Sequence, residues 1–117
     1  MEIRNIECNE IKNLDEYYDY DGSILIQNEQ LGKDAIIIDS PIWRVENMGI
    51  LVAEGVYMAY DENAREGYPD WSVTVIYEDV KDEEFDPQKY IYFEQDPPST
   101  AIHNFLNYRR EHENERA

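Results

Sequence analysis

Carboxylates dominate the charged side chains of this chain. The sequence has 117 residues, with 27 Asp and Glu against 10 Lys and Arg, so its formal charge is −17. Such an excess of negative charge repels phosphate groups, which excludes direct binding to nucleic acid and docking on an anionic membrane. Ten of the acids lie in two clusters that together span 16 residues. These candidate partner-binding residues are Asp15, Glu16, Asp19 and Asp21 in the first cluster and Glu78, Asp79, Asp82, Glu83, Glu84 and Asp86 in the second.

Regularly spaced carboxylates can imitate the phosphates of a nucleic acid. On a helix, Asp15 and Asp19 would lie about 5–6 Å apart, and alternate residues of a strand lie about 6–7 Å apart. A row of such charges resembles one strand of a nucleic-acid backbone. Tyr17, Tyr18 and Tyr20 stand between the acids of the first cluster and would supply contact area and rings that stack on arginine. The two clusters therefore predict a binding face for a basic protein.

The first cluster also contains part of a calcium-loop pattern. The run from Asp19 through Asp21 and Gly22 resembles the middle of an EF-hand loop. Aligning Gly22 with the loop glycine puts Tyr17 at the first ligand position and Asn28 at the last. The first carboxylate and the bidentate glutamate are therefore missing, so we expect a β-turn at Gly22 and no metal site.

Catalytic patterns are missing from the sequence. It has no phosphate-binding loop, no dinucleotide-binding glycine motif and no nucleophile elbow. Cys8 is the only cysteine and lies in an acidic stretch, which disfavours a nucleophilic thiolate and rules out an intrachain disulfide. His103 and His112 are nine residues apart and do not share a helix face. We expect a protein that is not an enzyme and uses no cofactor.

Two helices are expected, one near each end of the chain. Glu7, Ile11, Leu14 and Tyr18 fall at helical spacing and predict a helix over residues 6–18, which would carry most of the first acidic cluster. The second helix follows Pro97 and Pro98, with Ser99 or Thr100 as its N-cap, and runs to about Glu111. Its apolar residues are expected to form core packing or a homodimer contact, and they are Ile102, Phe105, Leu106 and Tyr108.

Short segments rich in β-branched and aromatic residues predict the strands between these helices. Gly55 lies in the middle of one of them, which favours a strand with a bulge, or a hairpin. Residues 61–70 and 78–88 are expected to be loops, so the second acidic cluster would lie on a loop. The expected strands are residues 23–27, 35–39, 43–46, 49–60, 71–77 and 90–94.

This order of elements predicts a single α+β domain over residues 1–117, with a mainly antiparallel sheet flanked by an N-terminal and a C-terminal helix. Residues 1–4 lack a basic region before an apolar run, so no signal peptide is expected. The longest apolar runs, residues 35–38 and 50–53, are too short to span a bilayer. The expected compartment is the cytoplasm.

In acidity, small predicted α+β domain and carboxylate clusters, the chain resembles the small acidic DNA-mimic proteins of bacteria and phages. That class includes inhibitors of restriction enzymes, of uracil-DNA glycosylase and of CRISPR nucleases, and a mimic that binds the histone-like protein HU. The resemblance implies a cytoplasmic partner that is a basic DNA-binding protein, such as an HU-like protein, a repressor or a nuclease. These mimics share a charge layout rather than a motif, so the resemblance assigns no residue a role.

Two other functions fit the same composition. An immunity protein or antitoxin would neutralise one basic toxin, such as a nuclease, whereas a DNA mimic would compete with DNA for its partner. A structural phage or host protein would have a solvated acidic surface and contacts that depend little on salt. The sequence leaves the oligomeric state open between monomer and homodimer.

Overall fold

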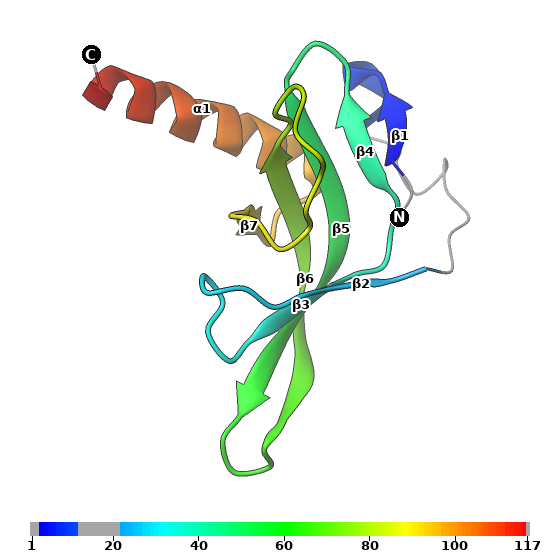
Figure 1. The fold of residues 1–117 in the computed structure, drawn as a ribbon, viewed down its shortest axis with the longest axis vertical. Helices are drawn as coiled ribbons and strands as arrows, with labels where there is room; N and C mark the ends of the chain where they lie inside the picture. The colour runs from blue at the N-terminus through cyan, green and yellow to red at the C-terminus, as the bar shows by residue number, and fades with distance from the viewer. Residues whose placement is uncertain (1–2, 12–21, 117) are drawn as a thin grey trace.

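The computed structural model describes residues 3–11 and 22–116, and the side chains within residues 3–11 and 22–111. Its strands curl into a half-barrel, and the helix lies across one end of it (Figure 1). The elements in chain order are β1 (Ile3–Ile6), β2 (Ile24–Ile26), β3 (Ala35–Ile38), β4 (Ile42–Val45), β5 (Ile50–Asp61), β6 (Glu66–Glu78), β7 (Tyr92–Glu94) and α1 (Pro98–Arg116).

Strand β5 is the centre of the sheet. One of its edges pairs with β6 along the whole strand, from Ile50 opposite Glu78 to Asp61 opposite Glu66. Its other edge pairs first with β4 and then with β3, both antiparallel. The sheet continues outward through β1 beside β4, β2 beside β3, and β7 beside β6. The β1–β4 pair is parallel and the other described pairs are antiparallel.

A corner between β3 and β4 lets two short strands share one edge of β5. The backbone N–H of Asp39 donates to the carbonyl of Glu54 at 3.1 Å, and the buried Ser40 hydroxyl accepts from the N–H of Glu54 at 2.9 Å. Hydrogen bonding along this edge of β5 therefore continues across the corner between β3 and β4. Gly55 lies opposite it, where an added Cβ would be 2.2 Å from the carbonyl oxygen of Ile37. Close backbone approach, rather than a turn, requires glycine at this position.

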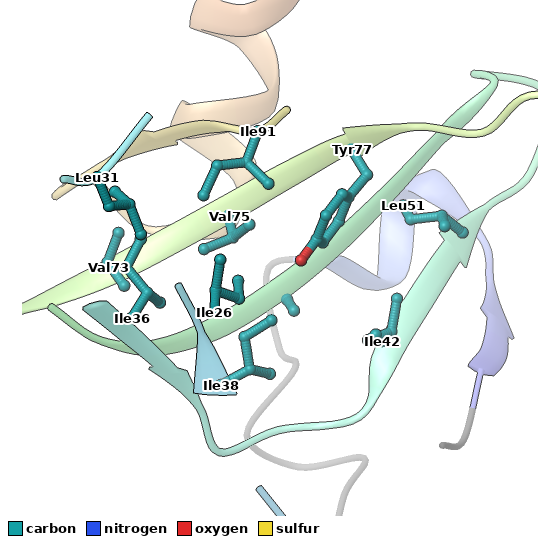
Figure 2. Packing of buried hydrophobic residues seen from close by; sticks show 11 residues of the cluster. Ile26, Leu31, Ile36, Ile38, Ile42, Leu51, Val73, Val75, Tyr77 and Ile91 are labelled. Carbon is teal, nitrogen blue, oxygen red and sulfur yellow. The ribbon is translucent and has the colours of Figure 1, made fainter. Parts of the chain in front are cut away.

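Both faces of the sheet are apolar, since successive residues of a strand point to opposite sides. On β5, Ile50 and Val52 point to one face, while Leu51 and Ala53 point to the other. The helix face is packed under α1. The buried cluster between them combines residues of the sheet and Ile11 with three residues of α1, and its members are Ile6, Ile11, Trp43, Val45, Ile50, Val52, Ile76, Ala101, Ile102 and Phe105. The loop face lies on the opposite side (Figure 2) and consists of Ile26, Leu31, Ile36, Ile38, Ile42, Leu51, Ala53, Val73, Val75, Tyr77 and Ile91.

The predicted N-terminal helix is wrong, and so is the α+β class with a helix on each side. Ile3–Ile6 is strand β1, paired with β4 from Ile3 opposite Ile42 to Ile6 opposite Val45. Residues 8–11 form a short 3₁₀ turn that buries Ile11, and the rest of the predicted helix lies outside the described residues. The spacing of Glu7 and Ile11 fits a single turn as well as a helix. Pairing with β4 makes the preceding residues, Ile3–Ile6, a strand. The described fold is mostly sheet, with one C-terminal helix.

Other boundaries match the expectations in part. Strands form within all six predicted strand segments. Ile50–Asp61 forms one continuous strand, so the bulge predicted within residues 49–60 is wrong. The register between β5 and β6 shifts after the Tyr57–Trp71 pair, and the unpaired extra residue there is Asp70 of β6. Of the loop predicted over residues 61–70, only residues 62–65 form a turn. The prediction is wrong for the residues after it, since β6 begins at Glu66.

Helix α1 begins earlier and ends later than predicted. Pro98 is its first residue and the N–H of Ala101 donates to the carbonyl of Pro97 at 2.9 Å, so neither Ser99 nor Thr100 is the N-cap. Proline suits the first helical position because its missing N–H would have no partner there. Ile102 and Phe105 are buried in the core, as expected, whereas 39 % of Tyr108 is exposed. In the described part of the chain, no helix has the length and apolarity needed to cross a membrane.

Candidate protein-binding surface

The second acidic cluster lies where β6 ends and the chain turns back over the sheet. Glu78 is the last residue of β6, and the other predicted acids lie on residues 79–91, here called the acidic loop. Phe85 and Ile91 of this loop pack into the loop face. Phe85 meets the Tyr77 ring edge-on, with centroids 4.9 Å apart. The buried Tyr77 hydroxyl donates to the carbonyl of Pro87 at 2.7 Å. Figure 2 shows the Tyr77 side chain within the cluster. Burial raises the pKa of Tyr77 above its usual range.

Two glutamines bind the acidic loop to the segment around β2. Gln88 Nε2 donates to the carbonyl of Leu25 at 2.8 Å, and its Oε1 accepts from the N–H of Gln27 at 2.8 Å. In the same way, Gln30 Nε2 donates to the carbonyl of Ile91 at 2.6 Å, and its Oε1 accepts from the N–H of Ile91 at 3.0 Å. Each amide group pairs with backbone as a neighbouring strand would. We call this contact the amide seam.

Asn28 completes the amide seam. Its Nδ2 donates to the carbonyls of Gln88 and Lys89 at 3.2 and 3.3 Å. An open hollow of about 380 Å³ lies over the seam, and 72 % of Tyr90 is exposed at its side. The seam thus joins β2 to the segment before β7. In the sheet, β2 and β7 each lie two strands away from β5, toward opposite edges.

Two of the predicted acids are neutralised by the chain's own arginines. Arg109 reaches Glu78 with both Nη2 and Nε, at 2.7 and 3.2 Å. Arg44 Nε donates to Asp79 Oδ2 at 2.7 Å, and Nη2 approaches Oδ1 at 3.4 Å. The N–H of Asp79, the first residue of the acidic loop, also donates to the carbonyl of Gly49 at 2.9 Å. Asp79 therefore holds the start of the loop to the sheet, and Glu78 joins the end of β6 to α1.

The remaining four acids of the cluster are exposed and unneutralised. Within residues 3–11 and 22–111, no lysine or arginine forms an ion pair with them. Asp86 accepts from the N–H of Gln88 at 2.9 Å, which folds the loop back toward the amide seam. The four acids are Asp82, Glu83, Glu84 and Asp86.

The first predicted cluster lies outside the described residues. Nothing in the described part of the chain places it beside the acidic loop or away from it, so their union in one binding face stays a prediction. Its residues are Asp15, Glu16, Asp19 and Asp21.

Sequence reasoning missed the groups that order the acidic loop. Gln30 and Gln88 had no distinguishing pattern, because an amide that pairs with backbone 61 residues away leaves no local trace. Phe85 interrupts the acids and Pro87 follows the last of them, and these two residues were the available signal that this segment is anchored. Among the described residues, no group of three or more His, Cys, Asp or Glu side chains is arranged to hold a metal ion.

Comparison with known proteins gives no relative to argue from. No family model matches the chain, and neither a curated protein nor a solved structure matches it.

Proposed function

We propose that this chain is a DNA-mimic protein, which occupies the DNA-binding surface of a basic DNA-binding protein such as an HU-like nucleoid protein, a repressor or a nuclease. The observation that carries the proposal is the acidic loop. Asp82, Glu83, Glu84 and Asp86 are exposed there without ion-pair partners among the described residues, on a segment held at both ends.

Anchoring makes such a loop better suited to binding than a free acidic tail. Ordering a flexible side chain at an interface costs about 0.5–1.5 kcal/mol, and a free tail would also lose backbone freedom. The acidic loop is already ordered by the Tyr77–Pro87 hydrogen bond and by the amide seam. The net charge of −17 would also attract a cationic partner over long range and speed association at low salt.

Charge reversal on the acidic loop tests the proposal. The variant carries Asp82→Lys, Glu83→Lys and Glu84→Lys, and a matched control carries Asp39→Lys, Glu46→Lys and Glu66→Lys at exposed sites outside the acidic loop and the amide seam. Both variants change the net charge equally. Partners are captured from native lysate at low and moderate salt, displaced with duplex DNA, purified and titrated against each variant.

We expect the loop variant to lose at least tenfold in affinity and the control less than threefold, with both retaining the unfolding midpoint of the parent. Equal losses of affinity in the two variants would mean that only the net charge matters. An unchanged affinity in the loop variant would exclude the acidic loop as the binding site. Capture of a single toxin that DNA does not displace would assign the immunity function instead. Contacts insensitive to both salt and charge reversal would indicate a structural protein.

A further inference from the structure

Three aromatic rings from consecutive strands of the sheet lie together at the margin of the loop face. Tyr57 of β5 stacks on Trp71 of β6, with ring centroids 4.7 Å apart and planes within 9°. Phe93 of β7 lies 5.8 Å from the Tyr57 ring and 6.2 Å from the Trp71 ring, with planes tilted by 26° and 25°. All three pack against the buried core but remain partly exposed. We call them the aromatic stack.

Carboxylates accompany the aromatic stack. The Tyr57 hydroxyl donates to Asp34 Oδ2 at 2.6 Å, and the N–H of Tyr60 donates to Asp34 Oδ1 at 2.8 Å. These two hydrogen bonds lower the pKa of Asp34, so its carboxylate is ionised at neutral pH. Burial and the Asp34 contact raise the pKa of Tyr57 to about 12, and the charge of Asp70 adds to this effect. The stack therefore lies in a negative field.

The chain's own cations stack on other rings. Lys33 lies 5.5 Å from the centroid of Tyr60, Lys89 lies 5.8 Å from that of Phe85, and Arg109 lies 5.0 Å from that of Phe105. Among the described side chains, none of the lysines or arginines lies over the aromatic stack. Trp71 is partly exposed beside the Tyr57 ring, and its indole is the ring type that attracts cations most strongly.

We propose that the aromatic stack is a subsite for an arginine side chain of the basic partner. This inference rests on the proposed function and extends it to residues outside the acidic loop. A guanidinium is planar and weakly hydrated, so it stacks on an aromatic ring while its N–H groups reach carboxylates. A lysine ammonium holds its water more strongly and gains less from the same place. The acidic loop attracts any cation, whereas the stack selects arginine.

Peptides of eight arginines or eight lysines, with equal charge, test this selectivity on the full chain. Calorimetry at moderate salt measures both affinities, and tryptophan emission reports the site directly. Only 2 % of Trp43 is exposed, whereas Trp71 is partly exposed, so a change on peptide addition comes from Trp71. We expect the arginine peptide to bind about five- to tenfold more tightly, a ratio typical of one cation–π contact.

Variants separate the aromatic stack from the acidic loop. Trp71→Leu should reduce the arginine preference to less than twofold and weaken the lysine peptide by a smaller factor than the arginine peptide. Tyr68→Leu, at an exposed ring of the same strand, should keep the preference. If Trp71→Leu does not fold, Trp71→Phe should fold and lower the preference by a smaller factor. Equal affinities for the two peptides in the parent, or a preference that survives Trp71→Leu, would overturn the subsite.

Failure of this subsite is distinguishable from failure of the proposed function. A loop variant that weakens both peptides equally, beside an unselective stack, leaves DNA mimicry and removes the arginine subsite. If the aromatic stack prefers arginine but the charge-reversal variant of the acidic loop still captures partner normally, the arginine subsite stands and DNA mimicry through the acidic loop is removed.

Discussion

The two faces of the sheet are covered in different ways. Helix α1 covers the helix face, and a helix satisfies its own backbone hydrogen bonds apart from those at its ends. The acidic loop covers the loop face and has no regular backbone pairing, so Gln30, Gln88 and Tyr77 supply hydrogen bonds to it. An irregular segment can cover a core only when side chains satisfy its buried polar groups.

This difference bears on function. Loops on a rigid scaffold commonly carry binding residues, because their sequence is less constrained than that of a helix or strand. The acidic loop keeps a few residues for anchoring and leaves Asp82, Glu83 and Glu84 exposed. Covering the core and presenting charge are thus divided among different residues of one segment. Three substitutions test the comparison through stability.

The largest expected effect is on the helix face. Phe105 is 6 % exposed and packs with the sheet under α1. Phe105→Ala should lower the free energy of unfolding by about 3–4 kcal/mol, because it removes a buried ring and leaves a cavity. Urea denaturation measures the change, with Leu106→Ala, at a partly buried position, as a smaller reference. A loss below about 1 kcal/mol would mean that α1 contributes little to the core.

A smaller effect is expected at the amide seam. Gln30→Ala removes both hydrogen bonds to the backbone of Ile91, whose side chain is 1 % exposed. Leaving such groups without partners should cost about 1–3 kcal/mol and speed amide hydrogen exchange at Ile91. The neighbouring Glu29→Ala is the control and should change stability by less than about 0.5 kcal/mol. Unchanged exchange at Ile91 would show that the loop is held without the seam.

The smallest effect is expected from Tyr77→Phe, which removes the hydrogen bond to Pro87 but keeps the ring. Stability at pH 7 should fall by about 1 kcal/mol. Burial raises the pKa of Tyr77 above its ordinary value of 10.0, so above that pH the unfolded state loses its proton first. Stability of the parent should therefore fall as pH rises past 10, and more steeply than that of Tyr77→Phe. Urea denaturation between pH 8 and 11 measures both slopes, and parallel slopes would contradict the assignment to Tyr77.

Local pattern was sufficient for most strands and insufficient at the N-terminus. Runs such as residues 35–38 and 50–53 are apolar and β-branched enough to predict strands whatever their neighbours. The interval from Glu7 to Ile11 matched helical spacing, yet Ile3–Ile6 pairs with β4, whose residues lie 39 positions further along the chain. Pairing at that separation cannot be detected from spacing within one segment. Residues 61–70 were expected to be a loop for a different reason: the segment is polar and contains Gly67 and Pro69, although β6 begins at Glu66 and pairs with the end of β5 across a short turn.

The amino-acid sequence by itself determined the excess of carboxylates, the location of the second acidic cluster after a strand, and the helix that follows Pro97. These properties depend on composition and on neighbours along the chain. Only the tertiary structure decided which acids have a counter-ion, because Arg44 and Arg109 pair with Asp79 and Glu78 across 35 and 31 residues of sequence. An ion pair or a hydrogen bond forms only when its two groups lie within a few ångströms of each other. Folding alone brings such partners within that range.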